Sequence, residues 1–464
     1  MKRMAEEYLE RWIENPYRKP LIIRGARQVG KSTLVRNFAK HKNLALIEIN
    51  LEKHPELDHI FKTLDMNTII RELEGLTGVN ILASHTLLFL DEIQATPRAL
   101  QALRYFYEEH PQLPVIAAGS LVEFVLSDHS FSMPVGRVEY YYLGPMSFEE
   151  FLFAYDSKLL DYIYNYDTVN PIPQTVHRHL LERQREFLFI GGMPEAVLRY
   201  IQTHQLNEVT HVHQSIIETY RDDFAKYVKQ SQLIRLRRVF DYVPSSIGKK
   251  VKYTNISRDD KSRELRTAID LLVKAGLIIP VQHSSCSGIP LNAQVNVNKF
   301  KLIFLDVGLA NRICGLDWLA IRSMDERKLI NEGGMAEQYI GQQLLYLNDG
   351  KETPKLFYWL REQQASNAEV DYVISRGDTI FPLEVKAGKS GSLKSLLQFV
   401  LDKKSRYAIR FDLNLPSVQK ISHKIQQEHK AEVVNMTLIS LPLYMVGQLN
   451  RLCDKMREGG IVQI

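Results

Sequence analysis

The stretch Gly25-Ala26-Arg27-Gln28-Val29-Gly30-Lys31-Ser32 has the form GxxxxGK[ST] of a phosphate-binding loop. It follows an apolar run at residues 21–23, which predicts a strand, and it precedes residues 33–39, which predict a helix. Glycines in such a loop let backbone N–H groups turn towards phosphate oxygens at a helix N-terminus. This strand–loop–helix context favours a phosphate-binding loop over a glycine-rich turn that only caps a helix.

The loop predicts a nucleotide site that takes ATP and Mg²⁺. Lys31 is expected to reach the β- and γ-phosphates, and the Ser32 hydroxyl to join the Mg²⁺ shell. The residues expected to contact the nucleotide are Gly25, Ala26, Arg27, Gln28, Val29, Gly30, Lys31, Ser32 and Thr33.

Strands are predicted at residues 44–50 and 86–90, and the latter ends in the carboxylates Asp91 and Glu92. An apolar run of this length is typical of a strand buried on both faces of a parallel sheet. Ligands bind at the carboxyl ends of such strands, so Asp91 is expected to hold Mg²⁺ and Glu92 to polarise the attacking water. The alternative is a pair of acids that caps the next helix.

Residues 114–119 predict another buried strand, and Ser120 follows it. Ser120 is placed to touch the γ-phosphate or the attacking water, or to cap the helix that follows, since serine favours that position. Both roles stay open. The alternation of strands and helices over residues 20–120 predicts an α/β fold with a parallel sheet and helices on both faces.

The composition is that of an ordinary globular protein: 464 residues, 45% hydrophobic, 24% charged and a net charge of +5. The three cysteines, Cys286, Cys314 and Cys453, form no CxxC pair, which argues against a disulfide framework and a cysteine-rich zinc site. The N-terminus lacks the apolar core of a signal peptide, and no apolar run approaches the length of a membrane span. A cytoplasmic protein without a membrane partner is therefore expected.

The motifs GARQVGKS (25–32), LLFLDEIQ (87–94), VIAAGS (115–120) and PVGRVEYYYLGPMSFEEF (134–151) resemble the AAA-type ATPase family. The resemblance is strongest to the prokaryotic branch that carries a C-terminal domain of unknown function. It implies metal binding by Asp91, water activation by Glu92 and nucleotide sensing by Ser120. It also places Arg137 where such proteins often present an arginine to a neighbouring subunit's nucleotide, which implies a homo-oligomer. A surface arginine in a salt bridge is the alternative for Arg137.

Four domains are predicted: an ATPase core at 1–147, a helical lid at 148–228, a winged-helix-like domain at 229–290 and a C-terminal domain at 291–464. The third segment reads as three helices followed by a strand hairpin, which resembles a winged helix-turn-helix. Its third helix carries Lys261, Arg263, Arg266 and Lys274, which would face DNA in such a domain. Protein packing or a solvated helix face would explain these residues equally well.

The C-terminal domain contains a predicted hairpin of residues 369–374 and 379–386. A two-residue loop at Arg376-Gly377 would place Glu369 opposite Glu384 and Asp371 opposite Pro382. The period of two then puts Glu369, Asp371, Glu384 and Lys386 on one face. Acids grouped in this way repel one another unless a cation joins them, and oxygen ligands suit Mg²⁺ or Mn²⁺.

This D-x12-ExK arrangement resembles the PD-(D/E)xK nuclease superfamily, which has a restriction-endonuclease-like fold. The resemblance implies a metal site at Asp371 and Glu384 with Lys386 beside it, and Glu337 fits the superfamily's glutamate on a preceding helix. The first motif has Val370-Asp371 in place of Pro-Asp. Solvated or ion-paired acids without activity are the alternative.

Residues 386–432 carry ten Lys and Arg against four Asp and Glu, which would suit either a phosphate backbone or a solvated surface. The first hypothesis is an ATPase whose nucleotide state controls a C-terminal, DNA-binding, nuclease-like module. The second is an ATP-regulated, metal-dependent DNA endonuclease. The third is a non-catalytic switch that binds ATP and a protein partner.

Overall fold

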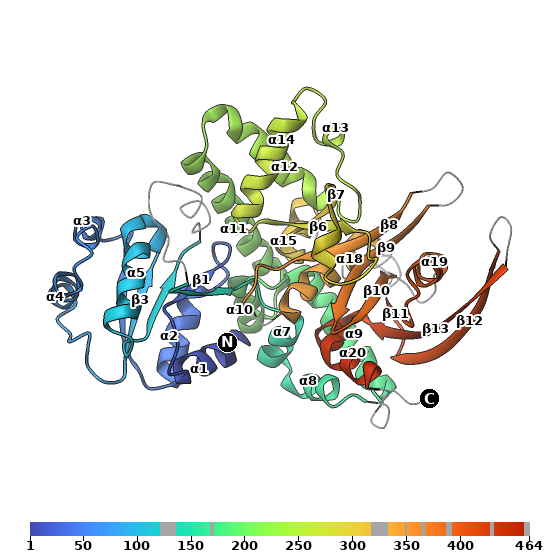
Figure 1. Ribbon diagram of the computed structural model, residues 1–464, viewed down its shortest axis with the longest axis horizontal. Coiled ribbons are helices and arrows are strands. Elements are labelled where there is room, and N and C mark those ends of the chain that lie inside the picture. Colours follow the sequence, from blue (N-terminus) through green and yellow to red (C-terminus); the bar gives the residue numbers. More distant parts are fainter. Residues whose placement is uncertain are drawn as a thin grey trace. The chain divides into compact units, whose positions relative to one another are not determined.

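The computed structural model describes residues 1–120, 136–167, 171–316, 333–348, 350–362, 367–386, 392–426 and 431–458 (Figure 1). The chain divides into two compact units. Unit 1 comprises Met1–Met146, Leu271–Leu277 and Asn348–Pro354, and unit 2 comprises Ser147–Asp270, Ile278–Leu347 and Lys355–Ile464. The predicted boundary after residue 147 lies next to this division, whereas the boundaries after residues 228 and 290 stay predictions.

Unit 1 is built on a five-stranded parallel sheet in the order β2-β3-β4-β1-β5. The strands are β1 (Leu21–Arg24), β2 (Ala45–Asn50), β3 (Thr86–Asp91), β4 (Val115–Ala118) and β5 (Glu139–Tyr142). The central strands β1, β3 and β4 are buried along their whole length, as in a sheet covered on both faces. The predicted parallel α/β sheet is confirmed, and the sequence missed the edge strand β5.

The helices of unit 1 pack on this sheet. They are α1 (Ala5–Glu14), α2 (Lys31–His41), α3 (Leu57–Phe61), α4 (Met66–Thr77) and α5 (Pro97–Glu109), with a short 3-10 turn at Ile93–Ala95. One apolar core joins α3, α4 and α5 to the sheet through side chains such as Phe61, Leu73, Leu88 and Phe106. This core fixes the strand ends that carry the motifs.

Unit 2 begins with helices and continues with a mixed sheet. Its helices are α7 (Phe148–Tyr155), α8 (Ser157–Tyr164), α9 (Gln174–Ile190), α10 (Pro194–Thr203), α11 (Leu206–Tyr227), α12 (Gln230–Ser245), α13 (Tyr253–Ile256), α15 (Val307–Ile313), α18 (Gly333–Leu344), α19 (Lys394–Lys403) and α20 (Leu449–Arg457). A further helix, α14 (Ser262–Lys274), starts in unit 2 and ends in unit 1. No helix among the described residues is long and apolar enough to cross a membrane.

The sheet of unit 2 has eight strands in the order β12-β13-β11-β10-β9-β8-β6-β7. They are β6 (Ile278–Ser284), β7 (Val295–Phe304), β8 (Leu356–Arg361), β9 (Ala368–Arg376), β10 (Thr379–Val385), β11 (Tyr407–Asp412), β12 (Ser417–Gln426) and β13 (Ala431–Pro442). Figure 1 shows α19 beside β10, β11 and β13, and its Phe399 packs against Trp359 at a ring distance of 5.1 Å. Short 3-10 helices lie at Leu291–Gln294, Leu345–Leu347 and Leu443–Gln448.

The predicted winged-helix-like segment has its three helices, α12, α13 and α14, in the expected order. Its hairpin differs from a separate wing, because β6 and β7 pair with each other and β6 also pairs with β8. The two strands therefore belong to the same sheet as the C-terminal hairpin, and the predicted boundary after residue 290 falls between paired strands. A winged-helix identity stays a prediction.

The register of the β9–β10 hairpin differs from the predicted one. Arg376 pairs with Thr379, so the two-residue loop is Gly377-Asp378 and not Arg376-Gly377. Gly377 has φ +57°, and a type II′ turn places glycine at this first loop position, whereas the predicted loop would have needed an arginine there. The shift of two residues keeps every side chain on its predicted face, and the same register carried one pair further places Asp371 opposite Glu384.

Candidate nucleotide site

The loop at residues 25–32 connects β1 to α2 in unit 1, as the motif requires. Gly25 has φ +143°, and a Cβ atom at this position would lie 2.0 Å from the carbonyl oxygen of Leu143. No other residue fits there without moving the backbone that follows β5. The first glycine of the motif is thus explained by the close approach of a neighbouring segment.

Lys31 is buried at the start of α2. Its ammonium group donates hydrogen bonds to the carbonyl oxygens of Gly25 and Ala26, at 3.0 and 2.8 Å. Burial lowers the pKa of Lys31 to about 8, and the carboxylates of Glu92 and Asp91 oppose this shift. Lys31 is therefore held inside the loop by backbone carbonyls, with its charge poorly solvated.

Ser32 and Asp91 meet where the loop and β3 end. The Ser32 hydroxyl donates a hydrogen bond of 2.8 Å to Asp91 Oδ2. Burial raises the pKa of the Asp91 carboxyl, while the bond from Ser32 lowers it. A hydroxyl and a carboxylate side by side at the carboxyl end of a parallel sheet are the oxygen donors that Mg²⁺ takes in nucleotide sites, so the residues present fit this ion.

Glu92 has a left-handed backbone, with φ +52°. Its N–H donates to Asp91 Oδ1 at 3.1 Å, and the Gln94 amide donates to Glu92 Oε2 at 2.5 Å. Left-handed φ is uncommon in residues other than glycine and clusters at functional sites. The strand end thus directs two adjacent carboxylates differently, one to Ser32 and the other to Gln94.

Ser120 follows β4 and is 6% exposed. Its hydroxyl oxygen accepts a hydrogen bond of 3.3 Å from Arg27 Nε of the loop, so the structure brings Ser120 to the predicted site. The alternative role, capping the next helix, concerns residues 121–135, which lie outside the described residues. Thr33, the last predicted nucleotide contact, has an exposed side chain.

Arg137 forms an ion pair of 2.9 Å with Glu108 of the same chain, and both side chains are solvent-accessible. This contact agrees with the surface salt bridge that the sequence allowed. Contact with a neighbouring subunit's nucleotide stays a prediction.

Arg3 was not predicted from the sequence, although it binds backbone carbonyl groups of the loop and of a neighbouring segment. Its buried guanidinium donates to the carbonyl oxygens of Val29 and Gly144, both at 2.9 Å. It thereby links the loop to the segment after β5. An arginine next to the chain start carries no local pattern that would have predicted this role.

Comparisons with known proteins agree with this geometry. Residues 17–152 match a family model described as "AAA domain". The N-terminal segment is therefore similar to an AAA domain. Residues 181–320 and 332–439 match two models described as domains of unknown function, DUF8612 and DUF4143.

Among curated proteins, the chain is 21% identical over 292 residues to the "Uncharacterized protein MJ1637" of Methanocaldococcus jannaschii. The match covers 60% of this chain and 60% of that relative's length. Among solved structures, the "Structure of C. elegans PCH-2" matches at 13% identity and a TM-score of 0.26, covering 45% of this chain and 64% of that one. A similarity this low does not indicate a shared fold, so the likeness to an AAA domain depends on the family model and the loop geometry.

The lowered pKa of Lys31 predicts that nucleotide affinity at this loop depends on pH. A lysine with a pKa of about 8 loses its proton as the pH rises above 8, whereas bound phosphates would keep it charged. Nucleotide affinity should therefore be constant below pH 8 and fall above it, approaching tenfold per pH unit. Equilibrium titrations between pH 7.5 and 9.5 measure this, with Lys31→Arg as the variant that stays charged. The same affinity at both ends of this range would contradict the prediction.

The second predicted constellation lies in unit 2 and includes a residue that the sequence did not predict, Lys301 of β7. Lys301 is 2% exposed, and its ammonium group forms ion pairs with Glu369 and, at 3.5 Å, with Glu337. Burial alone would lower its pKa, but Glu337, Asp371 and Glu369 outweigh burial and raise it. Lys301 is therefore a buried, permanently charged group among the predicted acids. The only signal in the sequence was a lysine at the start of an apolar run.

The acids around Lys301 are those predicted. Burial, followed by the charge of Asp371, raises the pKa of Glu337 to about 8. Asp371 Oδ2 accepts a hydrogen bond of 2.8 Å from the Val385 N–H, and burial raises its pKa too. Lys386 pairs with Glu384, whose pKa burial raises to about 7. The structure thus brings Glu337, Asp371, Glu384 and Lys386 together, with Lys301 among them.

A second metal ion at this cluster is not supported. Among the residues that the structure describes, no three carboxylate, imidazole or thiol groups are placed to hold a metal ion. The physical reason is that Lys301 already supplies a cation to Glu337 and Glu369. The predicted metal ligands Glu337, Asp371 and Glu384 are better described as a lysine-neutralised cluster.

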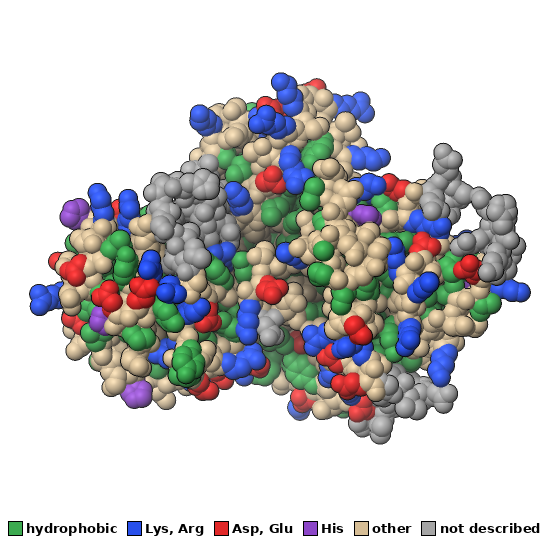
Figure 2. Space-filling view, in the orientation of Figure 1, with side chains coloured by type: hydrophobic (Ala, Val, Ile, Leu, Met, Phe, Trp, Pro, Cys, Tyr) green, Lys and Arg blue, Asp and Glu red, His purple; other side chains and the backbone are tan. Residues whose placement is uncertain are grey.

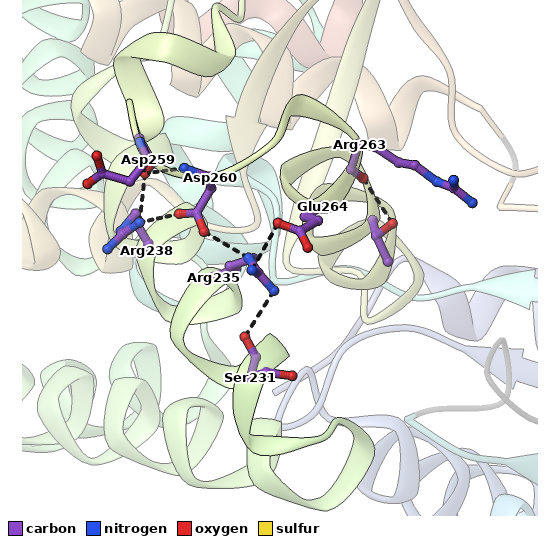
Figure 3. Close-up of polar contacts among 9 residues, drawn as sticks. Ser231, Arg235, Arg238, Asp259, Asp260, Arg263 and Glu264 are labelled. Carbon is purple, nitrogen blue, oxygen red and sulfur yellow. Dashed lines mark hydrogen bonds and ion pairs between the residues drawn. The ribbon is translucent and has the colours of Figure 1, made fainter.

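The predicted DNA-facing residues of α14 differ in their surroundings. Figure 2 shows Lys and Arg side chains gathered over α12, α13 and α14, and both Lys261 and Arg263 are exposed. Figure 3 shows Arg263 pointing away from a network in which Asp260 and Glu264 bind Arg235, at 2.8 and 2.9 Å. Arg266 pairs with Asp270 at 3.2 Å. Only part of the predicted set is therefore available to an external phosphate.

Proposed function

We propose that this chain binds ATP with Mg²⁺ and hydrolyses it, and that its nucleotide state controls the C-terminal module of residues 291–464. The observation that carries the proposal is the 2.8 Å hydrogen bond between Ser32 and Asp91, with Glu92 next in the chain. This arrangement connects the two motifs across 59 residues at the edge of the sheet where α/β proteins bind ligands. The match of residues 17–152 to the AAA domain model supports the proposal that the bound nucleotide is ATP.

Each residue would act through its own chemistry. Lys31 would leave the carbonyls of Gly25 and Ala26 to bind phosphate oxygens, and the N–H groups of the loop would hold the remaining oxygens. Glu92 would orient the attacking water and accept its proton. Ser120 would report the γ-phosphate through its bond to Arg27. Mg²⁺, held by Ser32 and Asp91, would neutralise charge on the β- and γ-phosphates.

The proposed control of the C-terminal module would act through α14. This helix begins in unit 2, and residues 271–277 at its end belong to the unit that holds the nucleotide loop. A Cβ atom at Gly276 would lie only 3.4 Å from the Ala26 backbone nitrogen, so the chain after α14 runs close beside the loop. A change of the loop on phosphate binding would therefore reach α14 through Gly276 and Ala275, the two residues that follow the helix.

DNA is proposed as the partner of unit 2, supported by the exposed cations of α12–α14, and Arg137 is proposed to act in a homo-oligomer. The endonuclease alternative is weaker, because Lys301 pairs with Glu337, one of the three predicted metal ligands, and with Glu369 on the same face. The non-catalytic switch would share the nucleotide site but would not need Glu92.

The direct test of the proposed function is ATP hydrolysis by Lys31→Ala. Without the ammonium group the loop loses its contact with the β- and γ-phosphates, so phosphate release should fall by about 100-fold or more. Lys40→Ala, which removes an exposed lysine from the same helix, is the control and should keep the wild-type rate. Equal rates in both variants would refute the assignment of the site.

A further inference from the structure

A pocket of about 480 Å³ lies in unit 2 at the turn of the β9–β10 hairpin. Its walls come from the turn itself, from the loop between α19 and β11, and from the end of α20. Four cations line it, Lys403, Lys404, Arg406 and Arg457, against the single carboxylate of Asp378. Part of the basic excess of residues 386–432 is therefore concentrated in one concave site.

The walls of this pocket are tied to one another by polar contacts. Arg376 of β9 binds both carboxylate oxygens of Asp454 in α20, at 2.8 and 3.0 Å. The Tyr407 hydroxyl of β11 donates to the Met456 carbonyl at 3.2 Å, and the Ser405 hydroxyl donates to the Ile380 carbonyl at 3.1 Å. The three walls are thus fixed before any ligand binds, which reduces the ordering cost of binding.

The cations of the pocket differ in how far the protein already satisfies them. Arg457 pairs with Asp378 at 3.2 Å and with Asp454 at 3.7 Å. In the described part of the chain, the side chains of Lys404 and Arg406 form no hydrogen bond or ion pair, and both are exposed. Like charges this close repel one another, and an anion between them would relieve the repulsion.

We propose that this pocket binds a phosphate group. Arginine presents a planar fork of donors that matches phosphate oxygens, and lysine adds a point charge, so Arg406, Lys404 and Arg457 together suit a phosphate better than a carboxylate. The phosphate belongs either to a small molecule or to the backbone of a nucleic acid, and in both cases the basic side chains bind its anionic oxygens. The site goes beyond the proposed function because it lies in unit 2 and uses none of the residues of the ATP site.

The test compares Lys404→Ala/Arg406→Ala with Lys420→Ala/Lys424→Ala. The second double variant removes two exposed lysines from β12 of the same unit and so changes the net charge equally. Both are made in the Lys31→Ala background, so that the ATP site does not capture the probes. The probes are fluorescein-labelled dT20, followed by anisotropy at several salt concentrations, and inorganic pyrophosphate, followed by calorimetry.

The pocket variant should weaken binding of at least one probe by about tenfold or more, while the β12 variant stays within about twofold. A loss for dT20, with a salt slope reduced by about 1.4, identifies a nucleic-acid backbone. A loss confined to pyrophosphate identifies a small phosphate ligand. Equal behaviour of the two double variants with both probes, or no binding of either probe to the parent protein, would overturn the proposal.

Discussion

Replacement of Glu92 by glutamine should lower the rate of ATP hydrolysis by about 100- to 10,000-fold, because an amide cannot accept the proton of the attacking water. The left-handed backbone at Glu92 and the bond from Gln94 orient this side chain, and its charge acts on Asp91 and Lys31. Binding of ATP should change little, since Lys31, Ser32 and the loop amides remain. Phosphate release under saturating ATP and equilibrium binding of ATP together measure the two effects.

The matched control for Glu92→Gln is Glu109→Gln, which makes the same chemical change at an exposed position at the end of α5. Its hydrolysis rate should equal that of the wild type. A Glu92→Gln variant that hydrolyses ATP as fast as the control would show that the water is activated elsewhere.

The largest effect on stability is expected from Lys301→Met. Removing one partner of a buried ion pair leaves uncompensated charge, which typically costs about 3–5 kcal/mol. Here Glu337 and Glu369 would lose their buried cation, and Asp371 would lose the opposite charge nearby. The stability of this sheet is measured by a urea titration in which hydrogen exchange of peptides from β9 and β10 is the readout.

Lys299→Met provides the control, because it lies two residues away on the same strand and also pairs with a carboxylate, that of Glu362 at 2.5 Å. Both side chains of that pair are exposed, so its loss should lower the free energy of unfolding far less than the loss of the buried lysine. A Lys301→Met variant as stable as Lys299→Met would mean that the cluster does not need its lysine.

The candidate nucleotide site could be located because its signals are local. The spacing within residues 25–32 predicts a loop between a strand and a helix. The apolar run that ends at Asp91 predicts a buried strand and the position of its carboxyl end. Parallel strands then bring those ends together without further information. Arg3 could not be predicted in the same way, because its partners Val29 and Gly144 are specified by the tertiary fold alone.

The C-terminal cluster was predicted less completely for the same reason. Side chains alternate with a period of two, and the register shift was also two residues. Asp371, Glu384 and Lys386 were therefore predicted on the correct face although the predicted loop was wrong. The register itself depends on which loop position glycine occupies. Lys301 comes from a strand about 70 residues upstream of Asp371, and no local pattern relates the two.

The turn at Gly191-Gly192 gives a third example. A glycine pair followed by Pro194 is typical of a break between helices, and α9 ends and α10 begins around it. The buried Asp306 carboxylate accepts a hydrogen bond of 2.6 Å from the Gly192 N–H, although 114 residues separate the two. Composition therefore located the break, and the fold supplied the partner that holds it.

The central claim, that ATP at the loop acts on unit 2 through α14, is tested most directly by hydrogen exchange of the Glu92→Gln variant with and without ATP and Mg²⁺. Exchange should be slower in the presence of ATP both at residues 25–32 and along α14, residues 262–274, and should not change in Lys31→Ala. Protection of residues 25–32 with unchanged exchange in α14 would contradict it.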